Sequence, residues 1–290
     1  MNLDCLYSRT AVEYDPDLDS DELTINEQVP SESAVQRVNQ FLDHVRCLAG
    51  ISTFASVTSE NNFPTGSGIA SSASGFAALS LAATAAVGLA LEQQALSRLA
   101  RRGSGSACRS VPGGFVEWLP GKDDESSYAI SIAAYDHWDL RDCIAIVSKE
   151  HKETGSAAGH SLAGSSLLQT VRVEDAQRRL DICRSAIINR DFQAFADIVE
   201  LDSNLMHAVM MTSHPQLYYW QPATLDVMQS VIKWRAGGVP VCFTIDAGPN
   251  VHVITTSEYS PAVMEKLNQI PGVIDVLASQ PGKEVRLLDQ

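Results

Sequence analysis

The chain has 290 residues, of which 45% are hydrophobic and 19% are charged. This composition is that of an ordinary globular protein and excludes disorder, collagen and coiled coil as the main structure. The length predicts about two domains, or one large domain with two lobes. With 21 Lys and Arg against 35 Asp and Glu, the net charge is −14. We therefore expect no nucleic-acid partner and no binding to anionic lipid through bulk charge. Backbone dipoles could still bind an anion locally.

The six cysteines are scattered, and no two of them form a Cys-x-x-Cys pair. The first residues lack the basic and apolar regions of a signal peptide. We therefore expect reduced thiols in a cytoplasmic protein. Residues 61–91 carry no charge, but they are rich in Ala, Ser, Gly and Thr. This composition favours a buried helix over a membrane span. The seven histidines show no metal-binding spacing, so no metal ligand is predicted.

The first half of the chain mixes strands with helices. Apolar and polar residues alternate over 10–14 and 23–25, which predicts two strands joined as a hairpin. An apolar stripe with serines at its start predicts a helix over 31–49. A strand at 54–58 leads into a Gly/Ser-rich loop at 64–72. Further along, the pattern predicts these elements: a long apolar helix to about 91, a helix at 92–101, and strands at 115–119, 128–133 and 143–147.

The second half is mostly helical before a small α/β unit closes the chain. The expected elements are helices at 175–189, 191–211, 221–236 and 261–269, strands at 240–245 and 251–254, and terminal strands near 273 and 285. The order predicts an α+β fold with two lobes. Residues 152–160 are rich in Ser and Gly and are expected to be a linker or a lid between the lobes.

The Gly/Ser-rich loop joins a predicted strand to the long apolar helix. Residues 61–73 read Asn-Asn-Phe-Pro-Thr-Gly-Ser-Gly-Ile-Ala-Ser-Ser-Ala. Glycines let the backbone approach a ligand closely, and a helix start offers unpaired N–H groups with a partial positive charge. With serine hydroxyls added, the segment can cradle a phosphate with few basic residues. It is no Walker A loop, because it lacks Gly-Lys-Ser/Thr. A tight turn with serine caps explains the same residues without a ligand.

Four sequence blocks resemble one known family. Residues 64–73, Pro-Thr-Gly-Ser-Gly-Ile-Ala-Ser-Ser-Ala, are similar to the phosphate loop of the GHMP kinase superfamily. The remaining blocks narrow the resemblance to the diphosphomevalonate decarboxylases within that superfamily. They are Arg-Arg-Gly-Ser-Gly-Ser-Ala-Cys-Arg-Ser at 101–110 with Gly-Gly-Phe-Val-Glu-Trp at 113–118, Asp-His-Trp-Asp-Leu at 136–140, and Phe-Thr-Ile-Asp-Ala-Gly-Pro-Asn-Val-His at 243–252. They occur in the family order and are spread over most of the chain.

The resemblance implies a two-lobed GHMP kinase-like fold. Its ATP-binding N-terminal lobe, of the ribosomal-protein type, is expected at 1–155, and a ferredoxin-like C-terminal lobe at 156–290. The implied activity is that of an ATP-dependent lyase of the mevalonate pathway. It phosphorylates the 3-hydroxyl of mevalonate 5-diphosphate transiently and decarboxylates the product to isopentenyl diphosphate, a step of isoprenoid and lipid biosynthesis. The resemblance further implies ATP and Mg²⁺ as cofactors, a small-molecule substrate, and a homodimer.

The same resemblance assigns the site residues. Asp246 is implied as the carboxylate that orients or deprotonates the 3-hydroxyl, although an Asp before Ala-Gly also caps turns. Arg109 is implied to grip the substrate carboxylate, since a guanidinium matches it bidentately. Ser104 and Ser106 would contact the diphosphate, and Arg37 would reach the substrate phosphates. Surface charge or loop capping explains these residues without a ligand. The implied ATP-binding residues are Pro64, Gly66, Ser67, Gly68, Ala70, Ser71 and Ser72.

One part of the family pattern has no counterpart in this sequence. The family begins with a strand that bears an Asn-Ile-Ala-x-x-Lys-Tyr-Trp-Gly-like motif, whereas this sequence opens at what resembles the following strand. The resemblance thus implies an N-terminal lobe without its first strand. Two alternatives stay open. One is a monophosphomevalonate decarboxylase or a mevalonate 3-kinase of the same fold, and the other is a non-catalytic homologue that lacks the substrate strand.

Overall fold

The computed structural model describes residues 1–63, 71–150 and 156–288. Contacts divide the chain into two compact units. Unit 1 holds the N-terminal part up to Tyr135 together with the tail from Pro281, and unit 2 holds Asp136–Gln280. This division differs from the predicted lobe boundary at 155/156, because the strand at Leu140–Ile146 is hydrogen-bonded into the sheet of unit 2.

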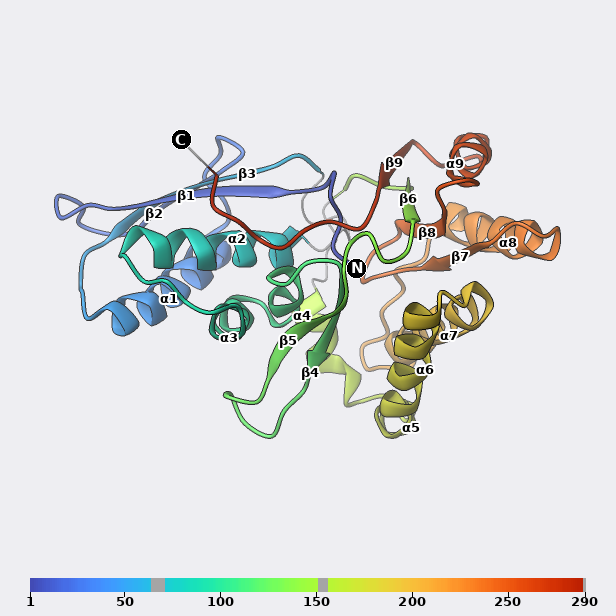
Figure 1. The fold of residues 1–290 in the computed structure, drawn as a ribbon, viewed down its shortest axis with the longest axis horizontal. Helices are drawn as coiled ribbons and strands as arrows, with labels where there is room; N and C mark the ends of the chain where they lie inside the picture. The colour runs from blue at the N-terminus through green and yellow to red at the C-terminus, as the bar shows by residue number, and fades with distance from the viewer. Residues whose placement is uncertain (64–70, 151–155, 289–290) are drawn as a thin grey trace. The chain divides into compact units, whose positions relative to one another are not determined.

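A three-stranded sheet forms one layer of unit 1 (Figure 1). Its strands are β1 (Ser8–Tyr14), β2 (Glu22–Ile25) and β3 (Ala55–Asn61), in the order β1-β3-β2. β1 is antiparallel to β3, and β2 is parallel to β3. The predicted β1–β2 hairpin is therefore wrong, although both strands exist. Parallel pairing of β2 with β3 needs a crossover, and α1 (Glu32–Ala49) supplies it.

Three helices complete the core of unit 1, namely α1, α2 (Ser71–Ala86) and α3 (Gln93–Gly103). Their buried faces meet the sheet in one cluster that includes Phe41, Leu42, Val57, Phe76 and Ala83. The predicted helix to residue 91 is too long, since α2 ends at Ala86. Gly88 follows with a φ of 74°. That left-handed conformation favours glycine and ends a helix.

The rest of unit 1 is a short 3₁₀ helix, a hairpin and the tail. The helix is η1 (Gly105–Ser110), and the hairpin strands are β4 (Phe115–Leu119) and β5 (Tyr128–Ala133). The strand expected near residue 285 is wrong. The backbone N–H of Val285 donates to Val111 O at 3.1 Å, but the tail is irregular there. Val285 packs against the core of unit 1, so its apolar character serves packing rather than a sheet.

Unit 2 is built on a four-stranded antiparallel sheet in the order β7-β8-β6-β9. The strands are β6 (Leu140–Ile146), β7 (Val241–Thr244), β8 (Val251–Thr256) and β9 (Asp275–Ser279). The helices are α4 (Ser156–Ala163), α5 (Gln169–Glu174), α6 (Ala176–Asn189), α7 (Phe192–Met211), α8 (Pro222–Ala236) and α9 (Ser260–Asn268). The strand expected near residue 273 corresponds to β9. The sheet and the helices α8 and α9 share one core, in which Val231, Phe243, Val253 and Leu267 are buried.

Helix length also bears on membrane insertion. No helix in the described part of the chain is long and apolar enough to cross a membrane.

Candidate active site

The predicted site residues that the structure describes fall in four places: α1, the start of α2, the segment around η1, and the loop after β7. The first three belong to unit 1 and the fourth to unit 2. Five of the predicted ATP-binding residues lie outside the described residues, namely Pro64, Gly66, Ser67, Gly68 and Ala70.

Hydrogen bonds from the sheet fix the start of α2. Ser74 Oγ lies 2.7 Å from Ser8 Oγ on β1 and donates to Ser71 O at 3.2 Å. Ser8 Oγ also donates to Asn61 Oδ1 at the end of β3. Asn62 follows directly and is fixed as well, since its amide donates to Cys5 O at 2.7 Å. The helix start, with its partial positive charge, is therefore held against the end of β3.

Two predicted serines and Arg37 meet beside this helix start. Ser72 Oγ lies 3.3 Å from Ser104 Oγ, and Arg37 Nη2 donates to Gly103 O at 2.9 Å. The Arg37 guanidinium lies 5.1 Å from the ring centroid of Phe76. We call Arg37, Ser72 and Ser104 the hydroxyl cluster. Arg37 thus also stabilises the C-terminal end of α3, which is a contact that sequence reasoning missed.

Gly103 makes that arrangement possible. A Cβ built on Gly103 would lie 2.0 Å from the Phe76 ring. Any other residue would displace either the ring or the end of α3. The sequence carries a signal for this role, a glycine directly after Arg101-Arg102, but the partner Phe76 is visible only in the fold.

Buried contacts hold η1 so that Arg109 is exposed. Ser97 Oγ donates to Cys108 O at 3.0 Å and accepts from Ala129 N at 2.9 Å, which ties η1 to α3 and β5. Burial raises the pKa of the Cys108 thiol, so it stays protonated. The Arg109 guanidinium makes no hydrogen bond or ion pair with any residue that the structure describes, while Ser106 is half-buried on the same segment. The segment therefore presents a cation that no described side chain neutralises.

The loop that carries Asp246 is held from several sides. Gly248 N donates to Asp246 O at 2.8 Å, which closes a tight turn directly after β7. Thr224 Oγ1 on α8 donates to Pro249 O at 2.7 Å. Asn250 Oδ1 accepts from Val147 N at 2.8 Å, at the end of β6. The Asp246 carboxylate itself is exposed. A rigid loop with an exposed carboxylate is well suited to binding or deprotonating a small molecule.

Two histidines near this loop were missed as functional candidates. His207 Nε2 donates to Ile245 O at 3.1 Å, and burial lowers the pKa of His207 to about 4, so the ring is neutral. His252 Nδ1 lies 2.8 Å from Asp142 Oδ2. Burial acts to lower the pKa of His252, but the Asp142 carboxylate outweighs it and raises the pKa to about 9. Both rings interact electrostatically with Asp246.

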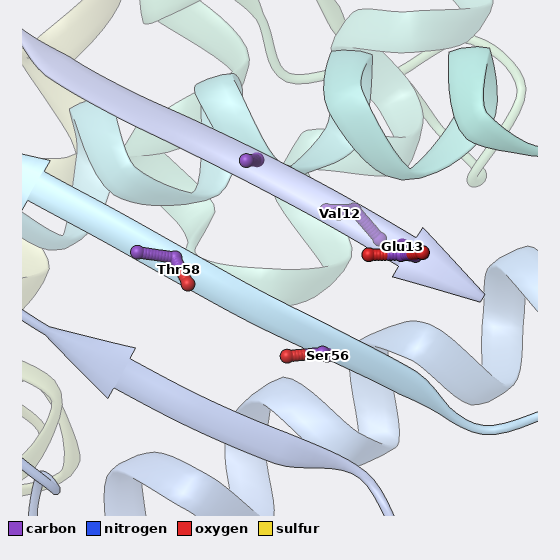
Figure 2. A pocket seen from close by; sticks show the side chains of 5 residues that line it. Val12, Glu13, Ser56 and Thr58 are labelled. Carbon is purple, nitrogen blue, oxygen red and sulfur yellow. The ribbon is translucent and has the colours of Figure 1, made fainter. Parts of the chain in front are cut away.

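A pocket elsewhere in unit 1 does not coincide with these residues. It lies over the β1–β3 pair and is lined by Ala11, Val12, Glu13, Ser56 and Thr58 (Figure 2). The side chains of Ser56 and Thr58 stand on β3 opposite Glu13 and Ala11 of β1. None of the predicted site residues lines it.

Family models match both halves of the chain. Residues 1–129 match the diphosphomevalonate decarboxylase-like N-terminal domain, and residues 143–284 match the mevalonate 5-diphosphate decarboxylase C-terminal domain. Among solved structures, mevalonate diphosphate decarboxylase from Staphylococcus aureus is 32% identical with a TM-score of 0.94, covering 99% of this chain and 88% of that chain. MDDEF in complex with MVAPP, AMPPCP and magnesium is 34% identical with a TM-score of 0.92, covering 99% of this chain and 89% of that one.

This chain belongs to the diphosphomevalonate decarboxylase family. The resemblance seen in the four sequence blocks is therefore confirmed, and so is the two-lobed α+β fold of the GHMP kinase type. Curated relatives in the family carry two names. Diphosphomevalonate decarboxylase from Ganoderma lucidum is 39% identical over 238 residues, 78% of this chain and 60% of that protein. Phosphomevalonate decarboxylase from Haloferax volcanii is 35% identical over 263 residues, 89% of this chain and 79% of that protein.

The match to most of the curated family members is partial. The chain spans 60% of the Ganoderma protein and 55% of the Candida albicans protein, both named diphosphomevalonate decarboxylase. Family membership therefore rests on the matches that cover most of both chains.

Proposed function

We propose that the protein catalyses ATP-dependent decarboxylation of mevalonate 5-diphosphate to isopentenyl diphosphate, through transient phosphorylation of the 3-hydroxyl. One observation carries the proposal. The fold matches MDDEF in complex with MVAPP, AMPPCP and magnesium over 99% of this chain. Four sequence blocks that resemble that family lie in this chain in the family order. The proposal includes ATP and Mg²⁺ as cofactors.

Ser72 of the hydroxyl cluster and the start of α2 fit the anionic part of ATP. Ser72 and Ser104 lie together beside the start of α2, whose first turn contains no acidic residue. A helix start combines unpaired N–H donors with a partial positive charge, which suits phosphate. We therefore propose that Pro64, Gly66, Ser67, Gly68, Ala70, Ser71 and Ser72 bind the nucleotide phosphates. Mg²⁺ in such sites is bound largely by phosphate oxygens and water.

The remaining site residues are assigned to the substrate. Asp246 accepts the proton of the 3-hydroxyl as its oxygen takes the γ-phosphoryl group of ATP. Arg109 binds the carboxylate until the bond to C2 breaks and carbon dioxide leaves. The electron pair of that bond becomes the new double bond as the 3-phosphate departs. Ser104, Ser106 and Arg37 bind the substrate phosphates. The exposed carboxylate of Asp246 supports its role, and so does the exposed guanidinium of Arg109, which pairs with none of the described side chains.

A second substrate is favoured by one observation. The Haloferax volcanii relative, named phosphomevalonate decarboxylase, is matched over 79% of its length at 35% identity. That coverage is larger than for the Ganoderma and Candida proteins. The alternative function is therefore decarboxylation of mevalonate 5-phosphate by the same residues.

A single assay separates these functions. Purified protein with ATP and Mg²⁺ is given mevalonate, its 5-phosphate or its 5-diphosphate, and ADP and carbon dioxide are measured together. Equal release of both from the diphosphate supports the main proposal, and from the monophosphate the alternative. ADP without carbon dioxide indicates a 3-kinase. No turnover of any of the three, with no ATP binding by calorimetry, contradicts an enzymatic role and indicates a non-catalytic homologue.

Two further expectations remain proposals of the same kind. We propose a homodimer, which sedimentation velocity tests, and a cytoplasmic location, which cell fractionation tests. A monomer at micromolar concentration, or recovery with membranes, would contradict them.

A further inference from the structure

β7 lies at the edge of the sheet in unit 2. Among the described strands it pairs only with β8, so no described strand lies beside the backbone groups on its other side. Such groups cost free energy when they are buried without partners. Three of the four residues of β7 are indeed buried, including Val241 and Phe243. Something other than a strand must therefore satisfy this edge.

Side chains from α7 and α8 occupy that edge. Arg235 Nη1 donates to Val241 O at 2.9 Å, and Glu200 Oε1 accepts from Phe243 N at 3.2 Å. Arg235 and Glu200 form an ion pair with each other. The free edge of β7 is thus hydrogen-bonded at every second residue, as it would be by an antiparallel strand.

The same pattern continues to the residue that precedes Asp246. Ile245 N donates to Ser203 Oγ at 3.0 Å, and Ile245 O accepts from His207 Nε2 at 3.1 Å. Ser203 Oγ also lies 3.3 Å from Ile245 O. Two side chains therefore fix both polar groups of the last backbone unit before the carboxylate.

Three of these side chains share one face of α7. Glu200, Ser203 and His207 are spaced three and four residues apart, the spacing that places helix side chains in one row. They are 8%, 5% and 1% exposed. α7 also lies beside β7 in the fold (Figure 1). We call these three residues the α7 row.

We propose that the α7 row replaces a fifth strand and sets the position of Asp246, so that Ser203 and His207 are positioning residues for the reaction. This inference rests on the proposed function, because it takes Asp246 as the reacting carboxylate. A slip of one residue along a strand moves every side chain to the opposite face. By holding Ile245 at both its N–H and its C=O, the α7 row prevents that slip next to Asp246. Asp246 itself stays exposed and free to meet a substrate.

The chemistry of His207 suits this role. Its Nε2 faces the carbonyl oxygen of Ile245, which can only accept, so the ring N–H donates the hydrogen bond. Burial keeps the ring neutral at physiological pH, as its pKa of about 4 shows. A neutral ring adds no buried charge and donates one directional hydrogen bond.

The test uses substitutions that remove the hydrogen bonds of one side chain at a time. Ser203→Ala and His207→Leu should lower kcat by roughly 10-fold to 100-fold, since a displacement of about 1 Å can have that effect. KM for ATP and for the substrate should change by less than about twofold, because neither residue is assigned to binding. His207→Gln should restore part of kcat, because its amide can donate to Ile245 O.

A matched control is available on the same helix. Phe195 on α7 packs edge-on against Trp138, with ring centroids 5.4 Å apart, and makes no hydrogen bond to β7. Phe195→Leu should lower the midpoint of thermal unfolding by an amount similar to Ser203→Ala and leave kcat unchanged. If Ser203→Ala and His207→Leu keep the parent kcat, or if Phe195→Leu loses as much kcat, the inference is wrong.

A second measurement does not depend on activity. Amide hydrogen exchange should become faster at Ile245 and Gly248 in Ser203→Ala and not in Phe195→Leu. Unchanged exchange at Ile245 would overturn the role of the α7 row. Failure of the proposed function gives a different result: the parent protein then has no turnover, or Asp246→Asn keeps it, whatever the exchange rates show.

Discussion

The hydroxyl cluster of unit 1 and the Asp246 loop of unit 2 are built in opposite ways. The hydroxyl cluster consists of exposed or half-buried side chains, linked by a 3.3 Å hydroxyl contact and one guanidinium–carbonyl hydrogen bond. The backbone on either side of Asp246 accepts hydrogen bonds from the buried side chains of His207 and Thr224. A phosphate can be held by many interchangeable donors, whereas a reacting carboxylate needs one position. We expect the two regions to respond very differently to single substitutions.

The largest effect is expected at Asp246. Asp246→Asn keeps the size of the side chain but removes its charge and its ability to accept a proton. We expect turnover to fall by roughly 10²-fold to 10⁴-fold, the range for a general base. Steady-state release of carbon dioxide measures this loss. Glu258→Gln, at an exposed acidic residue of the same unit, is the matched control and should leave turnover unchanged. A normal rate in Asp246→Asn would remove Asp246 from the mechanism.

The next largest effect is expected on the stability of unit 1, at a buried ion pair of α1. α1 carries the exposed Arg37 near its start and the buried Arg46 near its end. Arg46 forms a bidentate pair with Asp21 at 2.8 and 3.0 Å, and Asp21 also accepts from Ala55 N. Asp21→Asn should lower the free energy of unfolding by about 3 kcal/mol, because it removes the buried carboxylate that neutralises the Arg46 guanidinium. Urea denaturation measures this value.

Arg46 also offers its own control. It pairs with Asp43 at 2.7 Å, but the Asp43 side chain is 69% exposed. Asp43→Asn should therefore change stability by less than about 1 kcal/mol. Equal losses in the two variants would show that burial does not decide the strength of these pairs.

Stability should depend on pH through the two histidines beside the Asp246 loop. His207 has a folded pKa of about 4, below its ordinary value of 6.5. Its contribution to the free energy of unfolding is present above pH 6.5 and is lost as the pH falls toward 4, with a magnitude on the order of 3 kcal/mol. His252 has a folded pKa raised to about 9. Its contribution is present below pH 6.5 and is lost as the pH rises through 9.

Urea unfolding at pH 5, 7 and 9 checks the direction in which each histidine changes stability. His207→Gln should flatten the acid side of the profile and His252→Gln the alkaline side. Each variant serves as the control for the other, because their windows do not overlap. An unchanged acid side in His207→Gln would contradict the burial of a neutral ring.

Sequence reasoning predicted most elements and the family, but not the pairing that supports the site. Alternation located β1, β2 and β3, yet it cannot show that β3 lies between the other two. The motif of residues 243–252 marked Asp246, because that block is local in sequence. The α7 row is not local: Ser203 and His207 act on Ile245 from about forty residues away, and their spacing alone is equally typical of a helix face. Long-range hydrogen bonds are what the sequence pattern leaves out.

A smaller effect is expected where α3 meets Phe76. Gly103→Ala would place a methyl group 2.0 Å from the Phe76 ring. Overpacking of this kind lowers stability by about 1–3 kcal/mol. It should also weaken substrate binding, since Ser104 follows directly. The double variant Gly103→Ala with Phe76→Leu should recover stability relative to the sum of the single changes, measured by a double-mutant cycle. If the two single changes in stability simply add up, the Phe76 ring moves away from the added methyl group without cost.

The smallest effect is expected at Ser72, and it decides whether the two regions really differ. Ser72→Ala removes one hydroxyl from the hydroxyl cluster, and the N–H groups at the start of α2 remain. A single hydrogen bond of this kind contributes about 1 kcal/mol, or roughly fivefold in KM for ATP. kcat should stay near the parent value, because phosphate binding is shared among many donors. Loss of kcat as large as in Asp246→Asn would mean that the hydroxyl cluster, too, holds one reacting group in one position.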